Sequence, residues 1–193
     1  MTCQLPTRRM SRTPAPTTGK RIVLVRHGQG INNVPTIPND APDSLLTELG
    51  QQQALALRGH TALAGCGLLV VSPLSRAVQT ASLALGERPA CRTVLTALHS
   101  ERISTLCDYG RPKSQLAALF PFVADWSGFA ELPEDWSPTR ENDADWRERR
   151  LPAFVAWLRE QPESHIVVVG HGAFFGALLG KQLQNCECAE VEL

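Results

Sequence analysis

The sequence has no net charge, because its 19 lysines and arginines are balanced by 19 aspartates and glutamates. This balance argues against a protein whose main task is to hold a nucleic acid or an anionic membrane through positive charge. The longest apolar runs, residues 67–71 and 166–169, are far shorter than the roughly 20 residues that span a bilayer. We therefore expect a soluble, cytoplasmic protein with no nucleic-acid partner and no membrane contact, in which any phosphate is bound locally.

Two motif classes are also missing. The six cysteines include no Cys-x-x-Cys pair, and Cys186 and Cys188 have no histidine nearby that would complete a zinc site. We expect reduced thiols rather than a disulfide framework, because a chain of this length has a core of its own. No GxxxxGK[ST] or GxGxxG run follows a predicted strand, which excludes the common nucleotide-phosphate loops.

The length of 193 residues and a hydrophobic content of 43% predict one compact domain. Residues 1–20 hold three prolines, five threonines and four basic residues but no acidic one. We interpret residues 1–19 as a disordered N-terminal tail and residues 20–193 as the domain. Acid-free leaders of this kind also resemble organelle transit peptides, so targeting by the tail is the alternative, although no clear amphipathic pattern supports it.

Short β-branched runs alternate with helical patterns along the domain. Strands are predicted at residues 22–25, 67–71, 92–95 and 165–169, and helices at 47–59, 75–85, 114–120, 145–161 and 173–183. Pro152 should either bend the fourth helix or mark its start. The alternation predicts an α/β fold: a three-layer sandwich with a mostly parallel sheet and helices on both faces. A Pro-, Gly- and Trp-rich insertion around residues 116–142 should pack on this domain and, through Trp126 and Trp136, roof a pocket.

Chemistry-bearing residues follow three of the predicted strands. The first strand ends at Arg26-His27-Gly28, and the last ends at Gly170-His171-Gly172. Another strand leads through Ser72-Pro73 to Arg76 at the start of a helix. Ligands of parallel sheets bind beyond the carboxyl ends of the strands, so these groups are expected on one side of the sheet.

Each of these features has a plain alternative when taken alone. A histidine beside glycine is more often a hydrogen-bonded structural residue, and a lone arginine is more often a solvated charge. Together they indicate an anion site. Gly28 would let a ligand approach closely, the Arg76 guanidinium can bind two phosphate oxygens, and the N–H groups of Gly172 and Ala173 open a helix.

At this point the sequence resembles the histidine phosphatase superfamily, which includes the cofactor-dependent phosphoglycerate mutases and many phosphatases. The resemblance runs from about Lys20 to the C-terminus. Its motifs occur in the family's order: Leu24-Val25-Arg26-His27-Gly28 with Asn33, Leu46-Thr47-Glu48-Leu49-Gly50, Ser72-Pro73-Leu74-Ser75-Arg76-Ala77, Glu101 before Cys107-Asp108-Tyr109-Gly110, and Val168-Val169-Gly170-His171-Gly172. The resemblance implies a phosphoglycerate mutase-like fold.

The resemblance also implies roles for individual residues. His27 would be the phosphorylated nucleophile and Glu101 the proton donor. The phosphate pocket would consist of Arg26, Arg76 and His171, with Asn33 as a further phosphate contact and Gly172 contributing backbone.

The physics of the residues agrees with these roles. Two guanidinium groups disfavour a charged imidazole, so His27 should be neutral, and they balance the charge on the transferring phosphoryl group. We therefore expect no metal and no cofactor, and two histidines without a third ligand make a metal hydrolase a poor alternative. The same cations should keep Glu101 ionised until a bound phosphate reverses the field, and Asp108 is the alternative acid.

One departure bears on the reaction. The mutases carry an Arg-His-Tyr-Gly run after the acid, whereas Arg102-Ile103-Ser104 follows Glu101 here. This difference favours a phosphomonoester hydrolase acting on a small phosphorylated substrate or a phosphoprotein. The alternatives are phosphoglycerate mutase-type transfer and a binding module for phosphate or phosphoprotein that does not turn over.

Overall fold

The sheet seen in the computed structural model, which describes residues 19–38, 40–137 and 145–192, is mostly parallel. Its strands are β1 (Arg21–Arg26), β2 (Leu68–Val71), β3 (Arg92–Leu95), β4 (His165–Gly170) and β5 (Cys188–Glu192). They lie in the order β3-β2-β4-β1-β5, and only β5 runs antiparallel to its neighbour. Four strands confirm the prediction. The edge strand β5 was missed, because its residues are only partly buried and form no apolar run.

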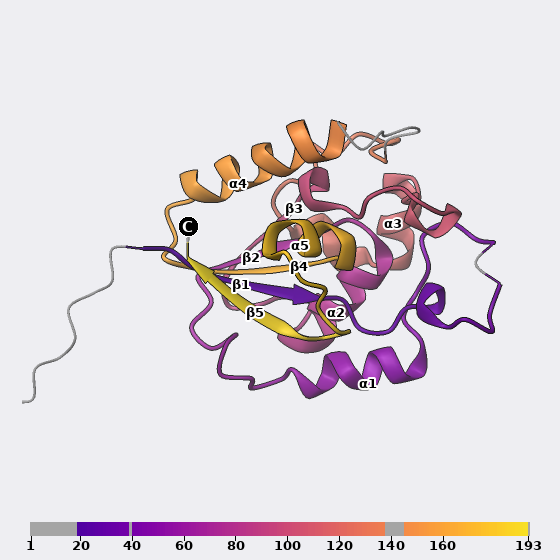
Figure 1. The fold of residues 1–193 in the computed structure, drawn as a ribbon, viewed down its shortest axis with the longest axis horizontal. Coiled ribbons are helices and arrows are strands. Elements are labelled where there is room, and N and C mark those ends of the chain that lie inside the picture. The colour runs from indigo at the N-terminus through magenta and orange to yellow at the C-terminus, as the bar shows by residue number, and fades with distance from the viewer. Residues whose placement is uncertain (1–18, 39, 138–144, 193) are drawn as a thin grey trace, which may run out of the picture.

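Helices cover both faces of the sheet, which confirms the three-layer α/β architecture (Figure 1). They are α1 (Glu48–Ala56), α2 (Ser75–Leu85), α3 (Lys113–Leu119), α4 (Leu151–Glu160) and α5 (Gly172–Leu179). Short 3₁₀ turns lie at Ile31–Asn33, Ala97–His99, Leu106–Asp108 and Pro121–Asp125. None of the described helices has the combination of length and apolar sequence that a bilayer crossing requires.

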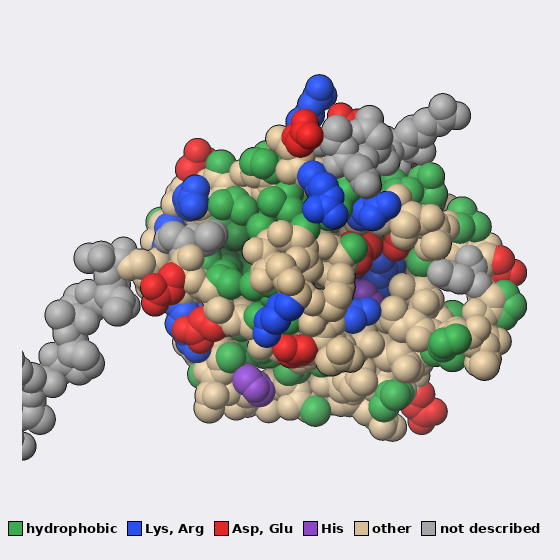
Figure 2. Space-filling view, viewed as in Figure 1, with side chains coloured by type: hydrophobic (Ala, Val, Ile, Leu, Met, Phe, Trp, Pro, Cys, Tyr) green, Lys and Arg blue, Asp and Glu red, His purple; other side chains and the backbone are tan. Residues whose placement is uncertain are grey.

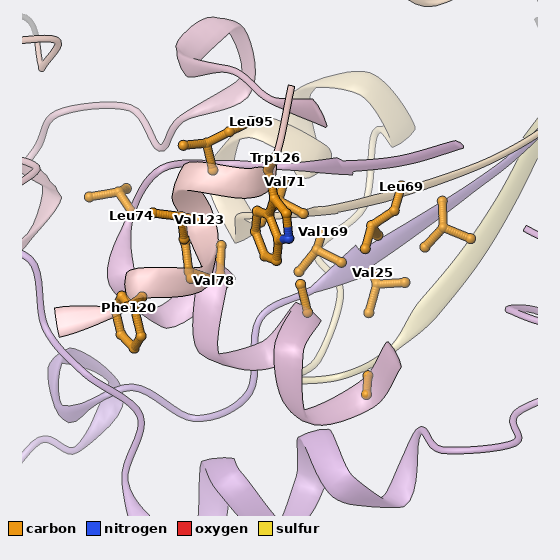
Figure 3. Packing of buried hydrophobic residues seen from close by; sticks show 14 of the residues in the cluster. Val25, Leu69, Val71, Leu74, Val78, Leu95, Phe120, Val123, Trp126 and Val169 are labelled. Atoms are coloured by element: carbon orange, nitrogen blue, oxygen red, sulfur yellow. The ribbon is translucent and has the colours of Figure 1, made fainter. Parts of the chain in front are cut away.

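Alternate residues of each strand enter two separate cores, as the period of a strand requires. Val23 and Val25 of β1 pack in the cluster that contains residues of α2, whereas Ile22 and Leu24 pack in the cluster with residues of α4 and α5. Figure 3 shows the first cluster, in which Val25 and other strand residues face Val78 and the Trp126 indole. Each such buried side chain contributes about 1.5–3 kcal/mol. The strands are therefore held from both sides, and their carboxyl ends are fixed in place.

Local signals explain where the helices start and stop. The Thr47 hydroxyl accepts the N–H of Gly50 (3.0 Å) and caps α1 as expected. Pro152 marks a start rather than a bend, because it lies in the first turn of α4, after a π-helical turn at Asp145–Arg150. The prediction that the last helix reaches residue 183 was wrong. Helix α5 ends at Leu179 because Gly180 adopts a left-handed conformation (φ 69°).

The described part of the insertion contacts the edge of the sheet. Ser127 forms a parallel bridge with Val94 of β3, and the Trp126 indole donates to the Glu87 carbonyl (3.0 Å). The Trp136 indole donates to the Arg111 carbonyl (2.9 Å). These contacts place the tryptophans in the body of the domain, so the expectation that they roof the pocket is not supported. Residues 138–142 of the insertion and residues 1–18 of the predicted tail lie outside the described residues.

Candidate active site

Two neighbouring strands bring the two histidines together. Arg26 at the end of β1 pairs with Gly170 at the end of β4, so the next residues, His27 and His171, lie side by side with ring centroids 5.3 Å apart. Arg76 enters from the first turn of α2, after β2 on the other side of β4. All three side chains are buried. His27 is the most exposed of them, at 2%. Figure 2 shows the corresponding hollow, in which a histidine lies among basic and acidic side chains.

The hydrogen bonds of His27 fix its tautomer. Its Nδ1 lies 2.7 Å from the Gly28 carbonyl oxygen, which can only accept, so Nδ1 carries the proton. The opposite nitrogen, Nε2, is therefore unprotonated, and its lone pair accepts the N–H of Arg76 Nε at 3.3 Å. Burial, followed by the nearby charges of Arg76 and Arg26, lowers the pKa of His27 well below its usual range. The imidazole is thus neutral and aims a nucleophilic nitrogen into the cationic pocket.

Gly28 brings two backbone segments into contact. A Cβ atom at this position would lie 2.4 Å from the carbonyl oxygen of Gly50 in α1. The Gly28 N–H donates to Thr80 Oγ1 (3.0 Å), which in turn donates to the Arg76 carbonyl (2.7 Å). The glycine allows two backbones to touch, and the hydroxyl links the His27 loop to α2. The expected close approach of a ligand at Gly28 stays a prediction.

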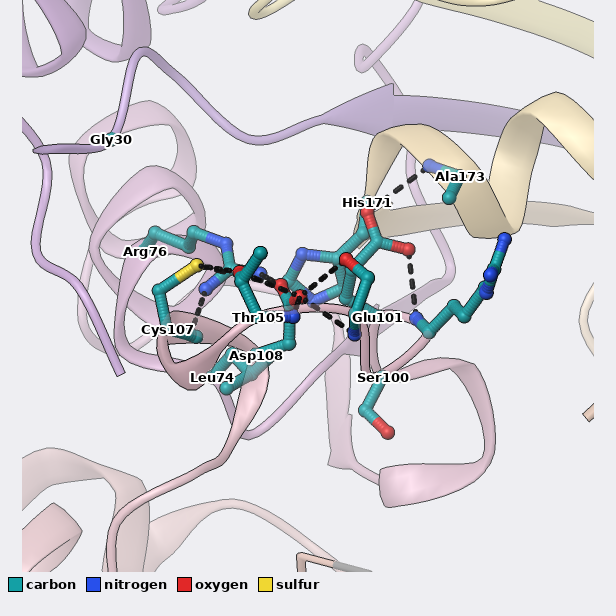
Figure 4. Close-up of polar contacts among 12 residues, drawn as sticks. Gly30, Leu74, Arg76, Ser100, Glu101, Thr105, Cys107, Asp108, His171 and Ala173 are labelled. Carbon is teal, nitrogen blue, oxygen red and sulfur yellow. Dashed lines mark hydrogen bonds and ion pairs between the residues drawn. The ribbon is translucent and has the colours of Figure 1, made fainter. Parts of the chain in front are cut away.

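Arg76 is held on three sides without exposure to water. Besides its contact with His27, it donates to the Cys107 carbonyl (2.9 Å) and to Asp108 Oδ1 (3.2 Å). The other oxygen of Asp108 accepts from the N–H and hydroxyl groups of both Ser104 and Thr105 (2.9–3.2 Å). Figure 4 shows this cluster. Asp108 therefore pairs with the guanidinium and orients it, which argues against its use as the alternative acid.

Glu101 occupies the amino end of α5. Its Oε1 accepts the N–H groups of Arg102 (2.9 Å) and Phe174 (3.1 Å), and its Oε2 accepts that of Ala173 (3.0 Å). Burial raises the pKa of this carboxyl, although the bonds from Ala173 and Arg102 oppose the shift. The N–H group of Ala173, which we expected to face a phosphate, is therefore held by this carboxylate.

Arg26 and Gly172 form one wall of the site. The Arg26 guanidinium donates to the Leu183 carbonyl (2.6 Å), and a Cβ atom at Gly172 would lie 3.1 Å from its Nε. That buried Nε has no hydrogen-bond partner among the described residues. Burial lowers the pKa of Arg26, while Glu101 opposes this change. An arginine with one unused donor beside His27 is suited to receive an anionic oxygen.

Asn33 supports the loop that carries His27. Its Oδ1 accepts from the Gly30 N–H (3.0 Å) and from Asn185 Nδ2 (3.2 Å), and the same Asn185 group donates to the His27 carbonyl (2.9 Å). Sequence reasoning missed Asn185, because it follows the last helix and no local pattern marks it. Asn33 therefore has a structural role in this loop. Its expected contact with phosphate stays a prediction.

Other supporting residues were also missed. The Ser72 hydroxyl lies 2.8 Å from His171 Nε2, which its place at the end of β2 could have suggested. Arg150 donates to the carbonyl groups of Ser100 (2.5 Å) and Glu101 (3.3 Å), and no signal in the sequence links these segments. Burial, followed by the charge of Arg76, lowers the pKa of His171 well below its usual range. Both buried imidazoles therefore favour the uncharged form.

A second buried network fixes the helix that carries Arg76. Asp43 Oδ1 accepts the N–H of Ser75 (2.7 Å), and its Oδ2 accepts the hydroxyl of Ser75 (2.6 Å) and the Arg111 guanidinium (2.7 Å). A carboxylate at the amino end of α2 complements the helix dipole. Within the described residues, no group of three or more histidine, cysteine, aspartate or glutamate side chains could hold a metal ion.

Known proteins match this chain in sequence and in fold. The model of the histidine phosphatase superfamily (branch 1) matches residues 22–190. A phosphoglycerate mutase-like protein 1 of Arabidopsis thaliana is 30% identical over 88% of this chain and 73% of its own length. A glucosyl-3-phosphoglycerate phosphatase of Mycolicibacterium vanbaalenii is 28% identical over 86% of this chain and 77% of its own length.

Among solved structures, a phosphoserine phosphatase of Entamoeba histolytica has a TM-score of 0.56 at 20% identity, covering 88% of this chain and 89% of the other. This likeness shows a shared fold. The family model spans nearly the whole described domain and includes both histidine-bearing strand ends. The chain therefore belongs to the histidine phosphatase superfamily, whose related members include phosphatases and mutase-like proteins.

Proposed function

We propose that this protein is a phosphomonoester hydrolase that works through a phosphohistidine at His27. The observation that carries the proposal is the orientation of that imidazole. Its Nδ1 is bonded to the Gly28 carbonyl, and its Nε2 faces Arg76 at 3.3 Å. A neutral nitrogen beside a fixed guanidinium is the arrangement that phosphoryl transfer to an imidazole requires.

The first half of the reaction forms the phosphoenzyme. His27 Nε2 attacks the phosphorus atom, and the bond from phosphorus to the ester oxygen breaks. Arg76, Arg26 and His171 surround the transferring group, so their donors balance the charge on its oxygens. Glu101 gives its proton to the departing alkoxide, and a raised pKa suits it to that task.

The second half returns the enzyme to its starting state. A water molecule attacks the phosphohistidine while the Glu101 carboxylate takes its proton, and the bond from phosphorus to His27 Nε2 breaks. The products are inorganic phosphate and the free imidazole, with the Glu101 carboxyl protonated again.

Hydrolysis is favoured over mutase-type transfer by the segment after the acid. The hydroxyl groups of Ser104 and Thr105 donate to Asp108, so this segment supports Arg76. The similarity to a glucosyl-3-phosphoglycerate phosphatase agrees with a hydrolase and with a small phosphorylated metabolite as substrate. We place the activity in the cytoplasm, without metal or cofactor.

The test is hydrolysis of p-nitrophenyl phosphate after treatment with EDTA. Activity should survive chelation, and His27→Ala should abolish it. His60→Ala is the matched control, because His60 is exposed and lies outside the site. Quenching turnover with an alkaline denaturant should trap a phosphate on wild-type His27, and subsequent acid treatment should release it. Loss of activity on chelation, restored by a divalent ion, would contradict the proposal.

A second assay separates the hydrolase from its alternatives. With 3-phosphoglycerate, a hydrolase releases inorganic phosphate, whereas a mutase yields 2-phosphoglycerate without net release. A binding module would retain phosphate affinity and release nothing from any ester. Formation of 2-phosphoglycerate as the main product would replace the hydrolase with the mutase.

A further inference from the structure

Two cysteines lie side by side at the end of the sheet opposite the candidate active site. Strands β2 and β3 are parallel neighbours with Leu68 paired to Arg92. Cys66 stands two residues before Leu68, and Cys91 stands one residue before Arg92, so both precede adjacent strands at the same edge. Both side chains are partly buried against the same core cluster. This placement makes the two cysteines neighbours at one edge of the sheet.

The neighbouring thiols influence each other's ionisation. The Cys66 side chain lowers the pKa of Cys91, and the Cys91 side chain raises the pKa of Cys66. Of the two thiols, Cys91 therefore ionises more easily. A thiolate beside a protonated thiol is the pairing from which a sulfenic acid and then a disulfide form.

Cys91 is also reachable from solvent. It lines a surface cavity of about 300 Å³, together with residues that include Arg88, Arg92 and Trp126. The cysteines Cys186 and Cys188 offer a contrast, because burial raises the pKa of both thiols, that of Cys186 to about 12. Among the described cysteines, Cys91 thus combines access with thiolate character.

We propose that Cys66 and Cys91 are a redox-active dithiol that a hydroperoxide converts into an intramolecular disulfide. The Cys91 thiolate attacks one peroxide oxygen, the O–O bond breaks, and the second oxygen leaves as hydroxide, which is protonated to water. Cys66 then attacks the sulfur of the Cys91 sulfenic acid and expels hydroxide, which takes up the Cys66 proton. Two thiols are oxidised to one disulfide, and hydrogen peroxide is reduced to two molecules of water.

The bond would enclose β2 and α2, and so the helix that carries Arg76. Closing a loop of this length in the unfolded chain should raise the melting temperature by about 5–10 °C. Because the thiols lie at the amino ends of strands whose carboxyl ends form the active site, the cross-link stabilises that scaffold without entering the site.

The first experiment uses the full wild-type chain and hydrogen peroxide. Equimolar peroxide should remove two titratable thiols, and a non-reducing peptide map should contain one cross-link, between Cys66 and Cys91. Dithiothreitol should reverse both the cross-link and the rise in melting temperature. Cys186 and Cys188 are the internal control and should stay reduced. Survival of both free thiols, or a cross-link elsewhere, would overturn the proposal.

Two serine variants test the order of the steps. In Cys66→Ser the reaction should stop at a sulfenic acid on Cys91, which dimedone traps, and no cross-link should form. In Cys91→Ser, Cys66 should remain an unmodified thiol under the same peroxide dose. Dimedone labelling of Cys66 in that variant would refute the assignment of Cys91 as the first thiol oxidised. The wild-type peptide map decides the cross-link even where a variant does not fold.

Discussion

The two ends of the sheet differ in how deeply their ion pairs are buried. At the carboxyl end, Arg76 and Asp108 form an ion pair whose side chains are 1% and 6% exposed. At the amino end, Arg92 and Glu163 pair at 2.8 Å with side chains that are 40% and 18% exposed. Burial of the first pair carries a desolvation cost that the second pair mostly avoids. The proposed function accounts for the difference, since it uses the buried charges of the carboxyl end for binding and chemistry, whereas the exposed pair of the amino end contributes little to stability.

The largest test of this comparison concerns Glu101. If it protonates the leaving oxygen, Glu101→Gln should slow hydrolysis of alkyl phosphates by about 10²–10⁴-fold, because alkoxides are poor leaving groups. An activated aryl phosphate should lose much less, since its phenolate leaves without a proton. Steady-state rates on the two esters provide the measurement. Equal losses on both would remove Glu101 from the role of acid.

The pH dependence sharpens the same point. Because the pKa of Glu101 is raised, the carboxyl keeps its proton to a higher pH than an exposed glutamate. The kcat for an alkyl ester should therefore fall as pH rises through that pKa, and the aryl ester should lack this fall. The pKa of His27 is lowered, so its protonation should reduce activity only well below pH 6.5. A shared alkaline fall for both esters would contradict this assignment.

Asp108 should act through Arg76 and not through the leaving group. We expect Asp108→Asn to lower kcat/KM by about 10–100-fold, equally for alkyl and aryl esters, because a misplaced guanidinium affects every transition state. The ratio of the two esters' rates is the decisive readout. A selective loss on the alkyl ester would promote Asp108 to the acid.

His99 offers a smaller effect, on stability alone. This buried imidazole stacks on Phe154 and lies 3.1 Å from the Val169 carbonyl through Nε2, and burial lowers its pKa to about 3. The unfolded chain binds a proton near pH 6.5, so stability is complete above that pH and is lost as pH falls. Between pH 7 and pH 5 this residue alone should cost about 2 kcal/mol.

Urea unfolding of His99→Gln at the two pH values measures that cost. Glutamine can still donate to the Val169 carbonyl but does not titrate, so the variant should lose about 2 kcal/mol less than wild type on acidification. His60→Gln is the control, because His60 is exposed. An unchanged pH dependence in His99→Gln would show that this imidazole does not resist protonation.

The smallest effect is expected at the amino end of the sheet. Arg92→Gln breaks the exposed pair with Glu163 and should lower the free energy of unfolding by less than about 1 kcal/mol. Activity should not change. Chemical denaturation and the aryl phosphatase assay measure the two quantities. A fall in activity would show that a charge at the amino end also affects catalysis.

The sequence predicted those parts of the site that depend on local patterns, but not those that depend on contacts between distant segments. His27 and His171 were placed correctly because a β-branched run followed by His-Gly fixes a strand end, and parallel strands end together. Arg76 followed from its position in the first turn of a helix. The partners of Glu101 could not be predicted, because it binds the N–H groups of residues 173 and 174 across some 70 positions of chain. The contacts of Arg150 and Asn185 also join segments far apart in the chain, and no periodicity indicates them.

The contact between Gly28 and Gly50 has an epistatic consequence. A Cβ atom at Gly28 would lie 2.4 Å from the Gly50 oxygen, and one at Gly50 would lie 2.0 Å from the Gln29 oxygen. A first alanine at either position must separate the two backbones, and a second alanine then enters a gap that is already open. The double substitution should therefore cost less than the two single substitutions added together, since residues that share one contact are not independent. The effect of a substitution at Gly28 therefore depends on the residue at position 50, and the reverse also holds.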